Sequence, residues 1–414
     1  MGINKNLIAF FRANSNPRFI NYFYGISIND QEKKSFKDYS KVVLYRNEGL
    51  SASRISKLAN LPKRKIEHWI YEGNKPFVIR LLEKYLHLGN PKSGFQWLSV
   101  NSTRGGLFTG PWIQVPFQLK NIDDIYLVLE QSIPLPEYIT KSEAFNTELQ
   151  NCQKEHLFAY LLGFIVGDAS KTGIKRKQRT TRRIHIRLSV NYPTNLKLGN
   201  YASLCANGLG LRMGRRKNCP AGKLNPHPFY TWISQSSSFF QWIFHTCLGL
   251  QDHETTTYNP IRAKWLLSAP KEFKIAFLQG LADSDGFVDF NSQQIGIITE
   301  PNTQLVKEIL DSIKIHSTPK LFTQHKLWAL MINIKDAYNL PLFNPIVKSY
   351  RYQDTEKLFK ATQISGHWPE WLRLKVEYHI KQGLRGTKLM KKVLDEEGIA
   401  ITTKHIRRHV KLTI

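Results

Sequence analysis

Two aspartates that close matching apolar runs are the residues best suited to chemistry in this sequence. Asp168 ends the first run and Asp285 ends the second. The runs align without a gap, because Ala276 follows Ala159 and Asp285 follows Asp168 by the same 117 residues. Each carboxylate would stand at the negative end of a helix dipole, and neighbouring carboxylates repel each other. A divalent cation offsets both costs, and oxygen ligands with room for water suit Mg²⁺. Since paired metal ions promote in-line attack on phosphodiesters, the pattern indicates metal-assisted phosphodiester hydrolysis.

Two closely packed helices are the elements that must position these carboxylates. Each run has small residues four apart, Gly163 and Gly167 in the first and Gly280 and Ser284 in the second. Residues at that spacing share one helix face and let two backbones approach closely. We therefore expect the helices to pack through these faces and to bring the two aspartates side by side. The alternative is a pair of buried helices whose glycines serve packing alone; two copies in one register argue against it.

The two runs resemble the two motifs of the LAGLIDADG homing endonucleases, in the single-chain form that holds two pseudo-symmetric repeats. Residues 161–169, Leu-Leu-Gly-Phe-Ile-Val-Gly-Asp-Ala, match the first motif, and residues 278–286, Leu-Gln-Gly-Leu-Ala-Asp-Ser-Asp-Gly, match the second more closely. In that family the penultimate acidic residue binds metal, and this role carries over to Asp168 and Asp285. The resemblance implies a site-specific double-strand DNA endonuclease active in intron homing, with Mg²⁺ as its cofactor.

The first motif departs from the family pattern at two positions. Asp283 falls at the family's other acidic position, where the first run has Val166. The first motif also ends in Ala169 instead of glycine. If that position needs a left-handed backbone, alanine costs about 1 kcal/mol there. The first site would then be displaced, and equal cleavage of the two strands is not assured.

The ends of the two repeats also match, since Tyr258-Asn259-Pro260-Ile261 resembles Phe343-Asn344-Pro345-Ile346. In the resembling family each repeat often supplies a basic residue beside the metal site, and such a cation would stabilise charge developing on the phosphate. The candidates for this catalytic role are Lys264 and Lys348, with Lys326 and Lys357 as rivals. Any of these lysines could instead contact the DNA backbone.

The charge of the chain favours a polyanionic partner. The 59 Lys and Arg residues outnumber the 32 Asp and Glu residues and give a net charge of +27, which points to nucleic acid. A ribosomal-type or membrane-surface protein is the alternative, but no basic amphipathic tail is present and no apolar run would span a membrane. The four cysteines form no CxxC pair, which favours a reducing compartment. Without a secretion signal, we expect a cytoplasmic, nucleoid or organelle-matrix location.

A basic surface is expected next to the first aspartate. The basic run at 171–183 leads into residues 184–190, Ile-His-Ile-Arg-Leu-Ser-Val, which alternate as in a half-buried strand. Its apolar side chains would face a core and its polar ones would face DNA, mostly through phosphate contacts. The residues predicted to bind DNA in this region are Lys175, Arg182, Arg183, His185, Arg187, Arg215 and Arg216.

Residues 37–73 have the pattern of a helix-turn-helix. Ser51 is a suitable N-cap for a short helix that would bury Ile55 and Leu58. A tight turn would lead to a second helix, residues 63–71, whose basic outer positions suit a recognition helix in a major groove. An ordinary helical hairpin with a solvated basic face is the alternative. The predicted DNA contacts are Lys63, Arg64, Lys65 and His68.

The last fifty residues suggest a second helix-turn-helix. Helices are expected at 368–381, 387–397 and 402–410, with glycines between them. The exposed face of the last helix would carry the predicted DNA contacts Lys404, Arg407 and Arg408.

These patterns together predict an α+β protein. Its core would be the pseudo-two-fold, duplicated αββαββα core of the homing endonucleases, flanked by helical helix-turn-helix domains. The expected divisions are an N-terminal extension (1–36), a helix-turn-helix domain (37–90), a connector (91–150), two repeats (151–270 and 271–365) and a C-terminal helix-turn-helix-like domain (366–414).

The expected partner is double-stranded DNA, bound by a monomer at a long recognition site, with no membrane involved. Two other functions stay open from the sequence. One is a transcription regulator that keeps the fold and binds DNA without cutting it. The other is an RNA maturase that uses the same surface to fold an intron RNA.

Overall fold

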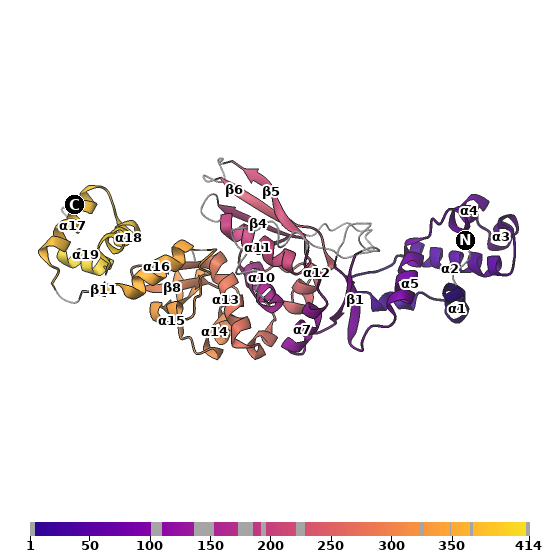
Figure 1. Cartoon of the computed structure of the whole chain (residues 1–414), viewed down its shortest axis with the longest axis horizontal. Coiled ribbons are helices and arrows are strands. Elements are labelled where there is room, and N and C mark those ends of the chain that lie inside the picture. Colours follow the sequence, from indigo (N-terminus) through magenta and orange to yellow (C-terminus); the bar gives the residue numbers. More distant parts are fainter. Residues whose placement is uncertain are drawn as a thin grey trace.

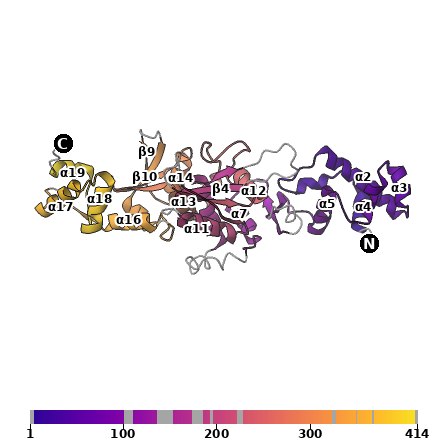
Figure 2. The ribbon, with the colours of Figure 1, turned by 90° about the horizontal axis from the view of Figure 1, so that it is seen from above.

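The protein is elongated, with a helical part at each end and a mixed helix and sheet part between them (Figure 1). The same order is seen from above, with the two ends of the chain at opposite ends of the molecule (Figure 2). The computed structural model describes all residues except 1–4, 101–109, 136–152, 173–184, 192–195, 221–227, 323–326, 348, 365–366 and 411–414. Within that described part, no helix combines the length and apolarity that crossing a membrane requires.

The N-terminal part is a helical bundle around an aromatic core. Its helices are α1 (Lys5–Ala13), α2 (Asp30–Asn47), α3 (Ala52–Ala59), α4 (Lys63–Ile70) and α5 (Phe77–Leu88), with a 3-10 helix at Arg18–Tyr22. Phe11 and Phe19 pack against Phe36, which is fully buried. Residues 1–36, whose sequence indicates no role, therefore complete the core on which α3 and α4 rest.

The hairpin of α3 and α4 has the local structure expected from its sequence, with one exception. The Ser51 side chain accepts a hydrogen bond from the Arg54 amide, as an N-cap does, and Asn60 ends α3 in a left-handed conformation. Ile55 is fully buried, but Leu58 is 55% exposed, so the prediction that Leu58 packs inward is wrong. The helix turns the side that carries Ala52 and Ile55 toward the core, and this orientation leaves Leu58 in solvent.

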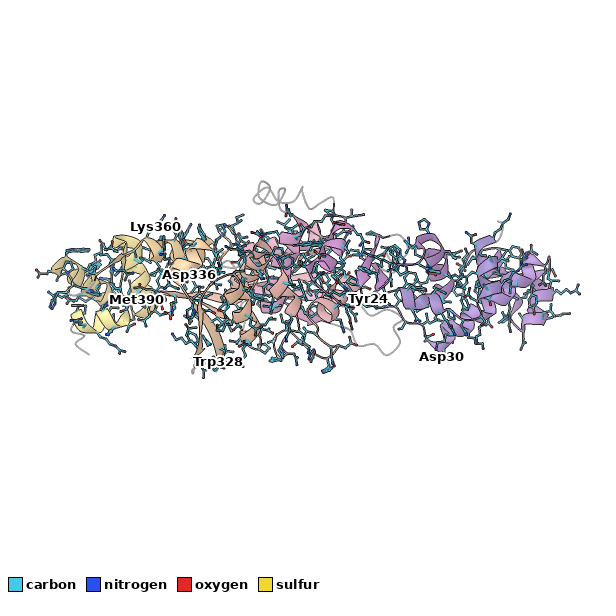
Figure 3. All side chains as sticks on the ribbon, turned by 90° about the horizontal axis from the view of Figure 1, so that it is seen from below. Tyr24, Asp30, Trp328, Asp336, Lys360 and Met390 are labelled. Carbon is cyan, nitrogen blue, oxygen red and sulfur yellow. The ribbon has the colours of Figure 1, made fainter. Side chains whose placement is uncertain are left out.

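Residues 95–130 join the N-terminal bundle to the centre of the molecule. Strands β1 (Phe95–Ser99) and β2 (Trp112–Pro116) form an antiparallel pair, followed by helix α7 (Ile122–Glu130). Leu98, Ile113 and Ile125 belong to the same buried cluster as the central helices, whereas Trp97 belongs to the core of the N-terminal bundle. The Tyr24 amide donates to the Trp97 carbonyl at 2.8 Å, and Tyr24 lies at the junction of the two parts in Figure 3.

The centre contains two successive runs of elements with the same order: helix, two strands, helix, two strands, helix. The first run is α10 (Lys154–Gly167), β3 (Ser170–Thr172), β4 (His185–Asn191), α11 (Leu196–Gly208), β5 (Met213–Cys219), β6 (Phe229–Ser234) and α12 (Ser238–Trp242). The second is α13 (Lys271–Asp285), β7 (Gly286–Asp289), β8 (Gln294–Ile298), α14 (Thr303–Ser312), β9 (Ser317–Phe322), β10 (Leu327–Asn333) and α15 (Ile334–Asn339). A π-helical turn (Ile243–Cys247) and a 3-10 helix (Lys264–Ser268) connect them.

The two sheets of the centre also share one topology. The strand orders are β3-β4-β6-β5 and β7-β8-β10-β9, and every neighbouring pair of strands is antiparallel. Each sheet therefore has its second and fourth strands, in chain order, in the middle. The protein thus mixes helices and sheets, as the sequence predicts.

The C-terminal part is helical and packs on the second run. It contains α16 (Ser349–Lys360), α17 (Glu370–Lys381), α18 (Gly386–Glu397) and α19 (Thr403–His409), with a parallel pair of short strands, β11 (Thr362–Gln363) and β12 (Ile399–Ala400). Lys391 on α18 binds both carboxylate oxygens of Asp354 on α16 at 2.7 Å. Phe290, next to strand β7, is buried in the C-terminal core. This core also contains Met390, which Figure 3 labels.

Candidate functional site

The centre of the molecule is the crossing of α10 and α13, where glycines let the two backbones touch. A methyl group added at Gly163 would overlap the Phe277 carbonyl, and one at Gly280 would overlap the Tyr160 carbonyl. Helix α10 is buried on all sides from Leu157 to Val166, which explains why its sequence is apolar without a polar face. The predicted packing through small residues is therefore present.

The crossing brings Asp168 and Asp285 together at the ends of the two helices. Asp168 is the residue that follows the last turn of α10, and Asp285 is the last residue of α13. One Asp285 carboxylate oxygen, Oδ2, lies 3.0 Å from the point that a Cβ atom on Gly167 would occupy. The two carboxylates, which lie far apart in the sequence, are thus neighbours.

The electrostatics of the pair show an unbalanced negative charge. Burial, and then the negative charge of Asp168, raise the pKa of Asp285 to about 7, while the Arg351 guanidinium acts in the opposite direction. Burial disfavours a carboxylate because it removes water, and a second carboxylate adds repulsion. The pair therefore favours the approach of a cation, as its sequence indicates.

The third acidic residue of the motifs, Asp283, has a different environment. It is fully buried, and its carboxylate accepts hydrogen bonds from the Tyr160 hydroxyl at 2.7 Å and from the Asn344 amide at 3.2 Å. Tyr160 lies on α10 and Asn344 in the loop after α15, so Asp283 joins three segments. Burial and the neighbouring Asp283 raise the pKa of Tyr160, which therefore stays a hydrogen-bond donor. Asp283 holds the helix crossing together.

Arg351 is a cation of the site that the sequence analysis missed. It lies on α16, its Nη1 is 3.4 Å from the Ala282 carbonyl oxygen, and its guanidinium is 5.7 Å from the centre of the Phe343 ring. These contacts hold it against the end of α13. The signal that could have found it is the repeated Asn-Pro motif, since the chain turns there toward α16 and Arg351.

Of the lysines predicted to assist catalysis, the two that the structure describes, Lys264 and Lys357, lie away from the pair. Lys264 precedes Trp265, whose ring packs on the ring of Phe273 with the centres 5.8 Å apart. Phe273 lies in the first turn of α13. Twelve residues of helix, about 18 Å, separate that turn from Asp285, so the structure does not bring Lys264 to the carboxylates. Lys348 and its rival Lys326 lie outside the described residues. The other rival, Lys357, forms an ion pair with Asp395 at 2.5 Å in the C-terminal part.

The alanine that ends the first motif does not strain the backbone. Gly286, the matching residue of the second motif, has φ −83° and ψ 158°, which any residue can adopt. Ala169 is also absent from the non-glycine residues of the described chain that have positive φ. The cost expected for Ala169 if this position were left-handed therefore does not arise. A Cβ at Gly286 would instead crowd the Ala282 carbonyl and the Phe343 ring.

The donor set at the pair suits a hard divalent cation. Among the described residues, no three His, Cys, Asp or Glu side chains gather as a metal-binding group. Two carboxylates are nevertheless sufficient protein ligands for Mg²⁺, which keeps several waters and often binds substrate phosphates as well. Burial and the charge of Asp168 raise the pKa of Asp285 despite Arg351, so a cation bound at the pair would favour the ionised carboxylate.

The structure places the predicted DNA-binding residues of the first sheet on different faces. Arg187 is exposed on β4 between the fully buried Ile186 and Leu188, so it points away from the core. Arg215 pairs with the buried Trp232, which puts it on the helix-covered side, with its guanidinium 4.9 Å from the centre of the Tyr230 ring. The residues outside the described part are Lys175, Arg182 and Arg183; the side chains of His185 and Arg216 are outside it as well.

The basic residues of the two terminal parts lie on the surface of their helices. On α4, Lys63 is 3.7 Å from Glu67, and Lys65 is 3.6 Å from Asp38. Arg64 donates to His68 at 3.3 Å. Surface pairs of this kind contribute little energy, so these cations can exchange their partners for phosphates. On α19 the exposed basic residues are Lys404, Arg407 and Arg408.

Comparison with known proteins finds partial structural likeness alone. A mesophilic variant of the homing endonuclease I-DmoI aligns with a TM-score of 0.34 and 18% identity, over 47% of this chain and 97% of that chain. I-DmoI in complex with DNA and Ca aligns with a TM-score of 0.34 and 19% identity, over 45% of this chain and 87% of that chain. The meganuclease I-SmaMI bound to uncleavable DNA aligns with a TM-score of 0.28 and 12% identity, over 58% of this chain and 92% of that chain. No protein-family model and no curated protein matches the sequence. At these scores the likeness carries no argument about activity.

Proposed function

We propose that this protein is a site-specific DNA endonuclease that hydrolyses one phosphodiester bond in each strand of a duplex. The observation that carries the proposal is the pairing of Asp168 and Asp285 at the ends of two crossing helices, with an unbalanced negative charge. Carboxylates arranged in this way are suited to hold Mg²⁺. A chain with a net charge of +27 is suited to bring a polyanion to them.

Each residue of the centre has a distinct part in this proposal. Asp168 and Asp285 would hold the metal, which when bound lowers the pKa of water and stabilises the leaving oxygen. Arg351 would place a fixed positive charge beside the phosphate, where negative charge develops during the reaction. Asp283 and Tyr160 would keep the two helix ends in place. The proposed metal site therefore uses the carboxylates of Asp168 and Asp285 and needs no third carboxylate from either motif.

The remaining basic residues would bind the duplex. Arg187 would contact it on the open face of the first sheet, and the surface cations of α4 and α19 would extend the contact to the flanking parts. We interpret α3–α4 and the C-terminal helices as helix-turn-helix modules, and the two runs of the centre as a duplicated homing-endonuclease core. Contacts of this kind position a protein through phosphates and select sequence through base edges.

The test is cleavage of a randomised double-stranded DNA library in the presence of Mg²⁺. We compare the protein with the double variant Asp168→Asn/Asp285→Asn and with Asp311→Asn, a surface carboxylate paired with Lys307, as a control. We expect selective double-strand cuts by the protein and the control, and binding without cutting by the double variant. Tight, selective binding without cleavage under either Mg²⁺ or Mn²⁺ would refute the enzyme and favour the regulator or the maturase.

A further inference from the structure

The two sheets can be compared rung by rung, starting from the aspartates. The residue two positions after each aspartate lies in the first strand of a sheet: Ser170 begins β3 in the first run, and Phe287 is the second residue of β7 in the second. In the first sheet the pairs that continue this rung are Ser170–Arg187, Arg187–Ile233 and Ile233–Gly214. In the second they are Phe287–Gly296, Gly296–Met331 and Met331–Thr318. Arg187 and Gly296 are therefore equivalent positions.

Both positions lie on the outer face of their sheet, which we define as the face turned away from its helices. Arg187 alternates with the buried Ile186 and Leu188. Gly296 alternates with Ile295 and Ile297, which are fully buried in the same central cluster. At the second position of this rung the first sheet therefore carries a guanidinium, and the second sheet carries no side chain.

An aromatic ring covers the place that Gly296 leaves open. A Cβ atom on Gly296 would overlap the ring of Phe287. The Phe287 ring in turn meets the Phe322 ring edge to face, with the centres 5.5 Å apart. Both rings are half-buried, so each keeps part of its surface in solvent. Gly296 is thus the residue that lets Phe287 lie across the sheet.

Lys320, a cation on this outer face, lies beside a carboxylate and an aromatic ring of the same face. Lys320 Nζ lies 5.0 Å from the centre of the Phe322 ring and 3.6 Å from the Asp289 carboxylate. Within the strands of the second sheet as described, the other outer-face positions next to the aromatic pair are Gln294, Ile298, Leu327, Ala329, Met331 and Thr318. Ala329 and Met331 are buried, so the exposed apolar surface comes mainly from the two rings, Ile298 and Leu327. The second sheet thus offers DNA an apolar surface at the place where the first sheet offers a guanidinium.

We propose that the two halves of the DNA target are read by opposite chemistry next to the cleavage centre. Arg187 suits guanine, whose O6 and N7 accept two hydrogen bonds from a guanidinium. The Phe287–Phe322 surface suits thymine, whose 5-methyl group is the apolar mark of the major groove. This inference rests on the proposed function, since it assumes that duplex DNA lies over the outer faces.

The first experiment selects binding sites from a randomised duplex library with the full-length protein in EDTA, so that binding is separated from cutting. The affinity of the selected duplex is then compared with that of the same duplex in which deoxyuridine replaces thymidine at each position in turn. We expect one half of the site to contain central thymidines whose replacement weakens binding about fourfold, the effect of one buried methyl group. We expect 7-deazaguanine, which lacks N7, to weaken binding roughly tenfold in the other half.

Two variants assign the halves to the sheets. Phe287→Ala should abolish the difference between thymidine and deoxyuridine and leave the 7-deazaguanine effect intact. Arg187→Ala should do the reverse, and each variant serves as the control for the other. If one variant fails to fold, the binding of the modified duplexes by the unmodified protein still tests the inference.

Different failures separate this inference from the proposed function. Selective cleavage of a site with no dependence on the 5-methyl group would overturn the inference and leave the endonuclease. Both variants acting on the same half would also overturn it. Methyl-dependent binding without cleavage after Mg²⁺ is added would support the inference and refute the endonuclease. Absence of any sequence-selective binding would refute both.

Discussion

Replacing Asp285 by asparagine should change how the stability of the metal-free protein depends on pH. Burial and the neighbouring Asp168 raise the pKa of Asp285 from an ordinary value of 3.8 to about 7. Between those values the folded protein keeps a proton that the unfolded chain has lost. Stability therefore falls as pH rises through this window, because folding must either retain the proton or bury the charge.

The size of the effect follows from the pKa difference. One pKa unit corresponds to about 1.4 kcal/mol, so a difference of about three units corresponds to roughly 4 kcal/mol between pH 4 and pH 7. The amide of Asp285→Asn matches the neutral carboxylic acid in shape and does not titrate. Relative to the variant, the unmodified protein should therefore lose up to roughly 4 kcal/mol over this range.

Urea denaturation in EDTA, followed by circular dichroism at several pH values, measures the difference. Groups that titrate in both proteins cancel in the comparison. Asp311→Asn, which removes an exposed carboxylate paired with Lys307, should give a pH profile parallel to that of the unmodified protein. Adding Mg²⁺ at pH 8 should stabilise the unmodified protein more than the variant, because a ligand of the folded state shifts the equilibrium by mass action. Parallel profiles for Asp285→Asn would refute the reasoning.

Three further substitutions test the packing around the site and the local structure of the N-terminal hairpin. Gly163→Ala places a methyl group against a carbonyl of the facing helix and should cost about 1–3 kcal/mol of stability. The control Gly214→Ala, with no atom within 4 Å of the new Cβ, should be close to neutral. Equal melting temperatures for the two variants would contradict the close crossing. Tyr160→Phe leaves Asp283 without its hydroxyl donor and should cost about 1–3 kcal/mol in urea denaturation, while an unchanged midpoint would show that the hydrogen bond is dispensable. Ser51→Ala removes the N-cap of α3 and should cost about 1 kcal/mol, detected as faster amide exchange in α3 and α4 and contradicted by unchanged exchange rates.

The sequence predicts the central helices and their aspartates because the signals there are local. Small residues four apart require close packing wherever the helices meet, and Asp168 and Asp285 then follow from their position at the helix ends. The strand pattern around Arg187 is equally local, since alternation along seven residues is sufficient to separate a buried face from an open one. These features need no knowledge of distant contacts.

The remaining parts of the site depend on contacts between distant segments, which no local pattern records. Arg351 reaches the end of α13 because α16 folds back after the Asn-Pro turn. The Asn-Pro motif locates that turn but does not distinguish Arg351 from the other basic residues that follow it. Lys264 follows a motif that looks equivalent to that of Lys348, yet Trp265 anchors it near the opposite end of α13. The exposure of Leu58 likewise depends on which side α3 turns to the aromatic core.

Strand-resolved cleavage is the decisive test of the role of the paired carboxylates. A selected duplex carrying a different 5′ label on each strand is incubated with the protein and Mg²⁺, and with Asp168→Asn and Asp285→Asn singly. We expect the unmodified protein to cut both strands and each variant to lose cleavage of at least one strand while it still binds the duplex. Cleavage of both strands at the unmodified rate by both variants would contradict the account.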